Sequence, residues 1–287
     1  MSAQPFLPSI MWENTIRNAL LEDLGTGGDL TTQALASPER TMRAAFRARQ
    51  DGVVAGLEGM RLAFTLLDPN ATVSYSTADG AAVGVGDTIA CVEGKASVVL
   101  GGERTALNIL SHLSGIASIT RQIVDKVSHT KARICCTRKT LPGLRAFQKY
   151  AVKIGGGHNH RYRLDDAILI KDNHLALYNG SITDALRKAR DYAGHLVCIE
   201  LEVDTLSQLE EALSCGVANT YLLDNMSIPQ LRQAVAMVAG RATVEASGGI
   251  TPDTAQDIAE TGVDVLSIGW LTHSVKALDI GLDVETA

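Results

Sequence analysis

The sequence predicts an α/β protein in which an N-terminal α+β domain precedes a parallel (α/β) barrel. Three observations support this fold class. Beyond residue 130, short β-rich runs alternate with helical stretches at intervals of roughly 20 to 30 residues. Most of these runs are continuously apolar, as in parallel strands that are covered on both faces. The first 130 residues lack this alternation, which indicates a separate domain.

Seven segments of the second half are predicted strands. They are RICCT (133–137), AVKIG (151–155), AILIK (167–171), LVCIELE (196–202), TYLLD (220–224), ATVEAS (242–247) and VDVLSIG (263–269). Repeated β-α units of this length build either a barrel or a doubly wound sheet. No dinucleotide-binding fingerprint follows the first strand, and this absence together with the strand number favours the barrel.

The helices expected between these strands begin with capping residues. SITDALRKARDYAG, DTLSQLEEALSCG and TPDTAQDIAETG each carry Ser, Thr or Asp near the start. In the last of them Thr251 is the expected N-cap, Pro252 the first helical residue and Gly262 the stop.

The N-terminal part reads as a helix, several strands and a long second helix. MWENTIRNALLEDLG is amphipathic, and FRARQDGVVAG, ATVSYSTADG and DTIACVEGKASVVL are predicted strands. The long helix is expected from about Glu103 to Val127. We expect the N-terminal domain to cover residues 1–112, joined by the tail 272–287, and the barrel to cover 113–271.

Composition limits the classes of function. Of 287 residues 46% are hydrophobic and 20% charged, which is typical of a globular protein. No apolar run approaches the roughly 18 residues of a membrane span, and MSAQPFLPSI lacks the pattern of a secretory signal. Five cysteines without a C-x-x-C pair argue against a disulfide framework or a zinc site. We therefore expect a soluble, cytoplasmic protein that is not bound to a membrane.

The charge distribution points to a small anionic ligand. The net charge of −6 argues against a nucleic-acid partner. However, the segment 138–171 holds eight basic and two acidic residues, so its own net charge is +6 and the remainder carries −12. A compact basic segment in an acidic protein suits a small polyanion, although a solvated helix face has the same composition.

The predicted strand ends carry most of the chemically active side chains. In parallel barrels, the loops at the carboxyl ends of the strands converge on one mouth. In chain order these ends present Thr137, Arg138 and Lys139; the glycines 155–157 followed by His160 and Arg161; Lys171; Glu202; Asp224; Ser247, Gly248 and Gly249; and Gly269. Seven unrelated strand ends would seldom combine three cationic ends, two acidic ends and two glycine turns.

Each of these elements also has a purely structural interpretation. Lys171 could be a rim lysine, Asp224 could cap the next helix, and the Ser-Gly-Gly segment could be a tight turn rather than a phosphate cradle. Glu200 and Glu202 share one face of their strand, and one of them could belong to a structural ion pair. Glu202 lies nearer the mouth and is the expected functional residue.

Three further motifs are weaker. His158-Asn159-His160 resembles a metal or nuclease motif, but no partner ligand lies at metal spacing. Cys135 and Cys136 are expected in the core of a strand. Arg104 is unfavourably placed for the dipole at the start of its helix, which suggests another role.

Together these groups suggest two kinds of ligand. Arg and Lys clusters hold carboxylates and phosphates. Two acids across the same mouth would repel such a ligand unless a hard cation such as Mg²⁺ lay between them, or unless they bound sugar hydroxyls. The expected substrates are a carboxylated anion and a phosphorylated sugar chelated to Mg²⁺. No Walker A motif, H-E-x-x-H motif or Ser-His-Asp arrangement competes with this interpretation.

Residues 136–174, CTRKTLPGLRAFQKYAVKIGGGHNHRYRLDDAILIKDNH, strongly resemble the quinolinate phosphoribosyltransferase family. Further matches in family order are EDLGTGGDLTT, GERTALNILSHLSGIAS, IELEVDTL, YLLDNM, VEASGGIT and SIGWLTHS, which together cover nearly the whole chain. Leu141 departs from the threonine of the family pattern. The segment between Glu202 and Asp224 is about one residue longer than in the family pattern. This difference leaves the choice between Glu200 and Glu202 open.

The resemblance implies an N-terminal α+β sandwich and a seven-stranded barrel of incomplete TIM-like type, assembled as a homodimer. The implied reaction transfers phosphoribosyl from phosphoribosyl pyrophosphate to quinolinate with loss of CO₂. The implied quinolinate site is Thr137, Arg138, Lys139, His160, Arg161 and Lys171, with Arg104 from the neighbouring subunit. The implied phosphoribosyl pyrophosphate site is Glu202, Asp224, Ser247, Gly248, Gly249, Ile268, Gly269 and Trp270. Lys139, Lys171, Glu202 and Asp224 are the expected catalytic residues, and Glu202 and Asp224 the expected Mg²⁺ site.

Two other functions remain possible at this point. One is a paralogue of the same fold with a different substrate, such as the molybdenum-transport-associated protein of this family. The other is a binding protein for sugar phosphates or carboxylates that has kept the scaffold. The His160-Arg161 pair and IKDNH favour quinolinate, and retention of both Glu202 and Asp224 favours catalysis.

Overall fold

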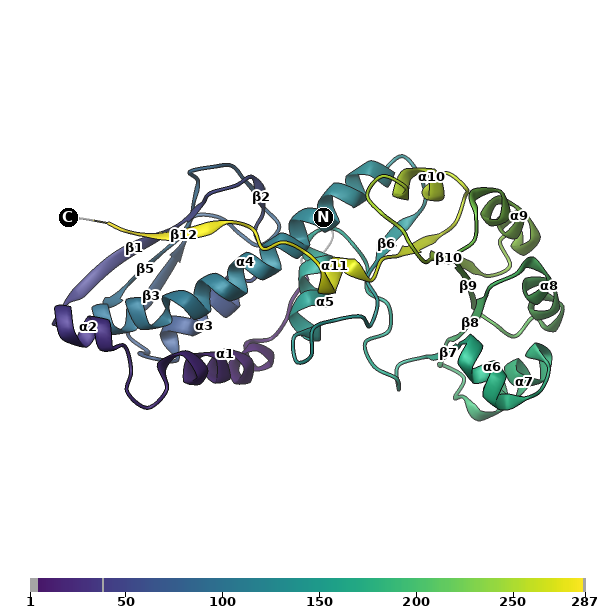
Figure 1. Cartoon of the computed structure of the whole chain (residues 1–287), viewed down its shortest axis with the longest axis horizontal. Helices are drawn as coiled ribbons and strands as arrows, with labels where there is room; N and C mark the ends of the chain where they lie inside the picture. Colours follow the sequence, from purple (N-terminus) through teal and green to yellow (C-terminus); the bar gives the residue numbers. More distant parts are fainter. Residues whose placement is uncertain (1–4, 38, 286–287) are drawn as a thin grey trace. The chain divides into compact units, whose positions relative to one another are not determined.

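The computed structural model describes residues 5–37 and 39–285 and divides into two compact units (Figure 1). The first unit gathers the chain up to Arg121, Thr140–Gly156 and the chain from Leu271 onwards. The second unit holds Gln122–Lys139 and Gly157–Trp270. Within the described residues no helix is both long enough and apolar enough to cross a bilayer.

The second unit contains the parallel sheet that the apolar runs predict. Among the described residues it has six strands in the order β6-β11-β10-β9-β8-β7, and all neighbours run parallel. The strands are β6 (Arg133–Cys135), β7 (Ile168–Ile170), β8 (Ile199–Val203), β9 (Thr220–Asp224), β10 (Thr243–Ser247) and β11 (Val265–Ser267). The predicted α/β class is therefore confirmed.

Helices cover the outer side of this sheet, as α8, α9 and α10 do in Figure 1. The helices are α6 (Asp172–Tyr178), α7 (Ile182–Tyr192), α8 (Leu206–Cys215), α9 (Ile228–Val238) and α10 (Ala255–Ala259). The expected start of α10 is wrong by one turn. Thr251 accepts from the backbone N–H groups of Thr254 and Ala255 in a turn that precedes the helix, and Thr254 is the N-cap.

The predicted strand 151–155 is wrong, because these residues form the last turn of helix α5 (Arg145–Ile154) and its C-cap, Gly155. The buried residues Phe147, Ala151 and Ile154 are spaced as on one helix face, a period that the five-residue run alone conceals. A single parallel bridge between Cys135 and His158 lies on the free side of β6, where the expected second strand would have paired.

The first unit is built on an antiparallel sheet in the order β12-β1-β5-β3. Its strands are β1 (Thr41–Ala48), β3 (Thr72–Tyr75), β5 (Thr88–Lys95) and β12 (Ile280–Val284), and a second small sheet pairs β2 (Gly52–Val53) with β4 (Ala82–Val83). The helices are α1 (Ser9–Leu24), α2 (Leu30–Leu35) and α3 (Leu57–Thr65), with α11 (Trp270–His273) at the later crossing between the units. The antiparallel N-terminal sheet confirms the expected α+β character.

Helix α4 (Ala96–Val127) begins earlier than predicted. The segment ASVVL, expected to continue the preceding strand, forms its first turns. Val98 and Val99 are β-branched and favour strands in isolation, but both are buried here, so packing overrides their local preference.

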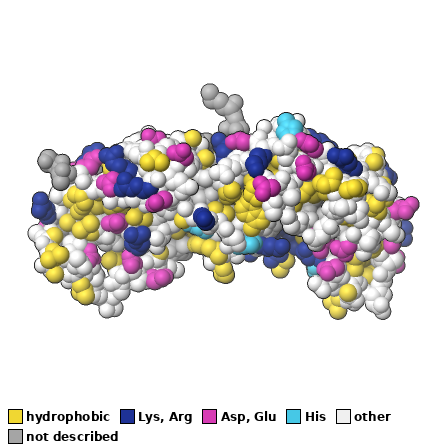
Figure 2. All heavy atoms as spheres, turned by 45° about the horizontal axis from the view of Figure 1, so that its top comes forward, with side chains coloured by type: hydrophobic (Ala, Val, Ile, Leu, Met, Phe, Trp, Pro, Cys, Tyr) yellow, Lys and Arg dark blue, Asp and Glu magenta, His cyan; other side chains and the backbone are white. Residues whose placement is uncertain are grey.

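Strand β12 pairs with β1 in a register that runs from Ala44 opposite Val284 to Ala48 opposite Ile280. Exposed ion pairs accompany this register, including Arg43 with Glu285 (2.7 Å) and Arg47 with Asp283 (3.5 Å). On the face drawn in Figure 2, Lys and Arg lie interspersed with Asp and Glu, as these pairs require. Exposed pairs of this kind contribute little to stability, because water screens both charges.

A hydrogen-bonded relay fixes the start of the loop that leads into α5. The Gln148 side chain accepts from the backbone N–H of Leu141 (3.0 Å), so its amide nitrogen faces His112 Nε2 at 2.9 Å. Because the Gln148 amide nitrogen can only donate, His112 Nε2 must accept, which requires a neutral imidazole. Burial lowers the pKa of His112 from 6.5, in agreement with this geometry.

The free energy of unfolding is expected to fall with the protonation of His112. Because the pKa of this group is depressed in the folded state, its contribution is complete above 6.5 and declines as the pH falls through the folded pKa. Denaturant titrations at pH 8 and pH 5 measure how much the free energy of unfolding changes with pH, and His112→Asn should reduce this change. An unchanged pH dependence in the His112→Asn protein would contradict this prediction.

Candidate functional site

The predicted site residues of the second unit gather at the carboxyl edge of its parallel sheet. Thr137 to Lys139 follow β6, Lys171 follows β7, Glu202 lies near the end of β8, and Asp224 and Ser247 end β9 and β10. Ile268, Gly269 and Trp270 follow β11. Arg104 lies exposed on α4, in the first unit. Because the strands are parallel, all of these residues except Arg104 lie at the same edge of the sheet.

Two arginines approach each other at this site. Arg161 donates from Nη1 to the carbonyl of Ala167 at 2.7 Å, and its buried Nε has no hydrogen-bond partner among the described residues. Burial, together with the nearby charge of Arg138, lowers the pKa of the Arg161 guanidinium. Like charges held together with a donor still unused favour binding of an anion.

Lys171 and Glu202 form an ion pair through Nζ and Oε2. The Lys171 backbone N–H donates to Nδ1 of His174 at 2.9 Å, which fixes the junction between β7 and α6. Glu202 is 10% exposed and Lys171 42% exposed, so the pair faces solvent mainly through the lysine. Lys171 is therefore paired across the site, rather than an isolated rim lysine.

The acidic end of β9 packs against the glycine turn after β10. Asn225, with a φ of 52°, donates from Nδ2 to Asp224 at 2.7 Å and from its backbone N–H to the carbonyl of Ser247 at 2.9 Å. Gly248 has a φ of 93°, and a Cβ there would lie 2.9 Å from the Asn225 nitrogen. The turn therefore requires glycine.

Two further contacts hold the loops after β10 and β11. Trp270 donates from Nε1 to the carbonyl of Ile250 at 2.7 Å. The buried Ile268 donates from its backbone N–H to the carbonyl of Cys135 at 2.9 Å. The expected phosphate-binding segments are thus tied to each other and to β6.

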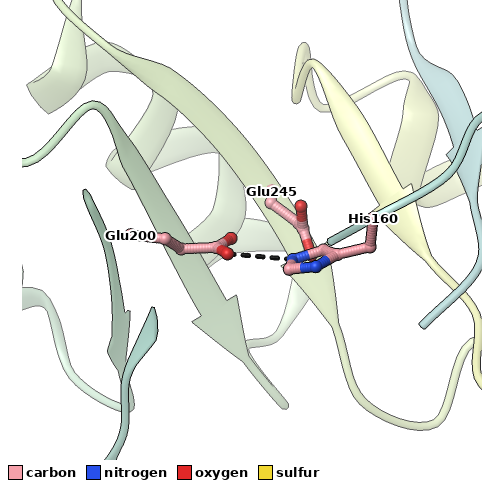
Figure 3. Close-up of side chains that lie close together, drawn as sticks. All are labelled: His160, Glu200 and Glu245. Carbon is pink, nitrogen blue, oxygen red and sulfur yellow. Dashed lines mark ion pairs between the residues drawn. The ribbon is translucent and has the colours of Figure 1, made fainter. Parts of the chain in front are cut away.

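A buried polar cluster lies within the sheet and includes His160 (Figure 3). His160 Nε2 is 2.9 Å from Glu200 Oε2 and 3.6 Å from Glu245 Oε1, and the two carboxylates come from β8 and β10. Ser267 of β11 donates to Glu245. Burial, and then the neighbouring Glu200, raises the pKa of Glu245.

Glu245, Ser267 and Asn225 were not predicted from the sequence as part of the site. Glu245 had one available signal, since it interrupts the otherwise apolar run ATVEAS in a strand expected to be buried on both faces. Ser267 and Asn225 had none, because their importance depends on the registers of β10 with β9 and β11.

Two sets of residues could be considered for a metal ion. Glu202 and Asp224 offer carboxylate oxygens from adjacent strands, the donor type that Mg²⁺ prefers. In the second set, the ligand atoms of His160, Glu200 and Glu245 lie within 4.8 Å of one another. However, His160 Nδ1 accepts from the Arg161 N–H at 2.8 Å, so the proton of the neutral ring resides on Nε2, which then cannot bind a metal. The donor chemistry therefore fits Mg²⁺ at Glu202 and Asp224.

These features define a class: parallel α/β proteins that bind anionic, phosphorylated small molecules at the carboxyl edge of the sheet. Arginines, paired acids and a glycine turn provide the complementary groups.

Comparison with known proteins narrows this class. Residues 29–114 match the family model "Quinolinate phosphoribosyl transferase, N-terminal domain", and residues 116–283 match the corresponding C-terminal domain. The chain is 46% identical to the Mycobacterium leprae nicotinate-nucleotide pyrophosphorylase [carboxylating], covering 94% of this chain and 96% of the relative. It is 44% identical to the probable enzyme of that name from Bacillus subtilis, covering 94% and 92%.

Solved structures agree with these matches. The crystal structure of NadC from Streptococcus pyogenes superposes with a TM-score of 0.93 at 38% identity, covering 98% of this chain and all of that one. The nicotinate-nucleotide pyrophosphorylase from Francisella tularensis superposes with a TM-score of 0.91 at 34% identity, covering 99% and 100%. The chain belongs to the quinolinate phosphoribosyl transferase family.

Proposed function

We propose that this protein transfers phosphoribosyl from phosphoribosyl pyrophosphate to quinolinate and releases nicotinate mononucleotide, pyrophosphate and CO₂, a step of NAD biosynthesis. The observation that carries this proposal is the approach of Arg138 and Arg161 at the strand edge that also holds Glu202 and Asp224. The two arginines suit the carboxylates of a dicarboxylate. The two acids suit a ribose, which has hydroxyls and develops positive charge in the reaction. Family membership supports the same reaction.

In this proposal the cations bind quinolinate. Arg138, Lys139, Arg161 and Lys171 face its carboxylates, with Thr137 and His160 beside them. A second copy of the chain supplies Arg104 in a homodimer, for which the exposure of Arg104 on α4 leaves room. The protein acts in the cytoplasm.

The other ligand, phosphoribosyl pyrophosphate, has its own group of residues. Glu202 and Asp224 bind the ribose hydroxyls. The 5-phosphate is held by Ser247, Gly248, Gly249, Ile268, Gly269 and Trp270, on the segments after β10 and β11. Backbone N–H groups in glycine turns bind phosphate without the desolvation cost of a buried lysine.

Catalysis in this scheme is electrostatic. As pyrophosphate departs, positive charge develops on the ribose, and the carboxylates of Glu202 and Asp224 stabilise it. Quinolinate, held by the arginines, presents its ring nitrogen to C1 of the ribose. The positive nitrogen of the resulting pyridinium stabilises the electron pair that CO₂ leaves on the adjacent ring carbon, and that carbon then takes a proton from water. Lys139 and Lys171 hold the two carboxylates of quinolinate. They must bind the carboxylate that leaves as CO₂ no more tightly in the ground state than in the transition state, because equal binding of the two states gives no acceleration. Mg²⁺, held by Glu202 and Asp224, would neutralise the pyrophosphate.

A turnover assay tests the function. Purified protein is mixed with quinolinate, phosphoribosyl pyrophosphate and MgCl₂, and both CO₂ and nicotinate mononucleotide are measured. Equimolar formation of the two is expected, with little product when EDTA replaces MgCl₂. Turnover of nicotinate but not quinolinate would instead identify a paralogue, and binding of both substrates without product would identify a binding protein.

Gly248→Ala should weaken the binding of phosphoribosyl pyrophosphate. The added Cβ would displace Asn225 and strain a backbone with a φ of 93°, so the phosphate-binding turn would have to move. We expect the KM for phosphoribosyl pyrophosphate to rise about tenfold, equivalent to about 1.4 kcal/mol, with little change in the KM for quinolinate. Gly194→Ala is the control, because nothing lies within 4 Å of its added Cβ. An unchanged KM in the Gly248 variant would contradict the assignment.

A further inference from the structure

The His160 ring is fixed by hydrogen bonds on both of its nitrogens. Nδ1 accepts from the backbone N–H of Arg161 at 2.8 Å, and a ring nitrogen that accepts carries no proton. The proton of the neutral ring therefore resides on Nε2. Since Nε2 is 2.9 Å from Glu200, it donates to that carboxylate. Neither nitrogen is left to bind a substrate carboxylate.

Two buried carboxyl groups hold the Nε2 side of the ring. Glu200 is 5% exposed and Glu245 4% exposed, and they lie close enough to interact directly (Figure 3). Two ionised carboxylates at this separation would repel strongly in a buried site, so one proton between them is favoured. Burial raises the pKa of Glu245, which identifies it as the proton carrier. A protonated Glu245 accepts from Ser267 and donates to Glu200.

Arg161 is held on the other side of the ring. Its backbone N–H is bonded to His160, and its Nη1 to the carbonyl of Ala167 at 2.7 Å. The contacts therefore run from Ser267 through Glu245, Glu200 and His160 to the Arg161 backbone N–H, and the Ala167 carbonyl holds the guanidinium of the same residue.

We propose that Glu245 and Glu200 are positioning residues, which act through His160 to hold Arg161 in place for the carboxylate substrate. In this arrangement Arg161 binds the substrate, and His160 orients Arg161. The substrate part rests on the proposed function; the arrangement of hydrogen bonds does not. An organised guanidinium binds a carboxylate without first losing conformational freedom, so loosening it should weaken binding more than turnover.

The chain contains a second histidine–glutamate pair, which is not connected to Glu245 or Arg161. His129 Nε2 lies 3.0 Å from Glu260 Oε1, so an imidazole Nε2 and a carboxylate oxygen are again at nearly the same distance. Both of these side chains are largely exposed. Substitutions at Glu260 therefore control for the loss of a histidine–glutamate pair as such.

The first experiment measures the tautomer directly and needs no substrate. Nitrogen-15 NMR of histidine-labelled protein distinguishes protonated from unprotonated ring nitrogens, and His160→Gln assigns the His160 signals among the seven histidines. A proton on Nε2 and none on Nδ1 is expected near neutral pH. A proton on Nδ1, or on both nitrogens, would overturn the proposal regardless of the enzyme's activity.

The second experiment compares Glu245→Gln with Glu245→Leu. Glutamine reproduces a protonated glutamate, since its amide group donates to Glu200 and its carbonyl accepts from Ser267, whereas leucine keeps the volume and loses both bonds. Glu245→Gln should keep the Nε2–H tautomer and a KM for quinolinate within twofold of the original. Glu245→Leu should raise this KM about tenfold while kcat changes less than threefold.

Two outcomes would contradict the inference. One is a folded Glu245→Leu protein with the original KM. The other is equal damage from both substitutions, as an ionised or metal-binding Glu245 would produce. Glu260→Leu should change neither the His160 signals nor the KM. Should Glu245→Leu fail to fold, the tautomer and the Glu245→Gln kinetics still decide the question. If the original protein does not turn over quinolinate, the proposed function fails while the NMR result stands separately.

Discussion

Arg138→Ala and Arg161→Ala should each lower kcat/KM for quinolinate by two to three orders of magnitude, mainly through KM. Each substitution removes a guanidinium that can bind a carboxylate bidentately, at a cost of about 1.4 kcal/mol per tenfold loss. The loss at Arg161 should be large, because its buried Nε has no hydrogen-bond partner among the described residues. Steady-state kinetics at saturating phosphoribosyl pyrophosphate measures both effects.

Arg163→Ala is the matched control for these arginines. Arg163 lies two residues from Arg161 on the same segment, but its side chain is exposed and paired with Asp165 at 3.2 Å. Its removal should change kcat/KM less than twofold. Unchanged kinetics in both Arg138→Ala and Arg161→Ala, with folded protein, would defeat the assignment of the carboxylate pocket.

Glu202→Gln and Asp224→Asn should lower kcat by about a hundredfold, equivalent to about 2.7 kcal/mol of lost transition-state stabilisation. Both substitutions preserve shape and remove a negative charge where positive charge develops on the ribose. Glu202→Gln also leaves Lys171 without its ion-pair partner, so it should disturb quinolinate binding as well. Both variants should need more MgCl₂ for half-maximal activity.

Rate measurements over a range of MgCl₂ concentrations separate these effects. Asp253→Asn serves as the control, because Asp253 is almost fully exposed and lies outside the proposed site. If Glu202→Gln and Asp224→Asn retain both the original kcat and the original response to MgCl₂, the carboxylates are not part of the catalytic centre.

Much of the site could be predicted from the sequence because one topological rule sufficed. Continuous apolar runs indicate parallel strands, and parallel strands place their carboxyl ends together. Lys171, Glu202, Asp224 and Ser247 could therefore be grouped without knowing the strand order. The rule needs only the end of each strand, which the change from apolar to polar residues marks.

Other features could not be predicted because they depend on registers and distant neighbours. AVKIG was mistaken for a strand because a short apolar run fits either structure, and only its packing in α5 decides. The cluster around His160 joins residues 160, 200, 245 and 267, and no local pattern shows that these side chains meet. Likewise, the left-handed backbone of Asn225 follows from its contact with the Ser247 carbonyl.

The pairing of β12 with β1 has a consequence for biosynthesis. The two strands lie more than 230 residues apart in the chain, so the N-terminal sheet gains its last partner only after Ile280–Val284 leave the ribosome. Contacts that distant in sequence form slowly. Until then β1 has a bare edge, which makes the nascent polypeptide a natural client for chaperones during translation.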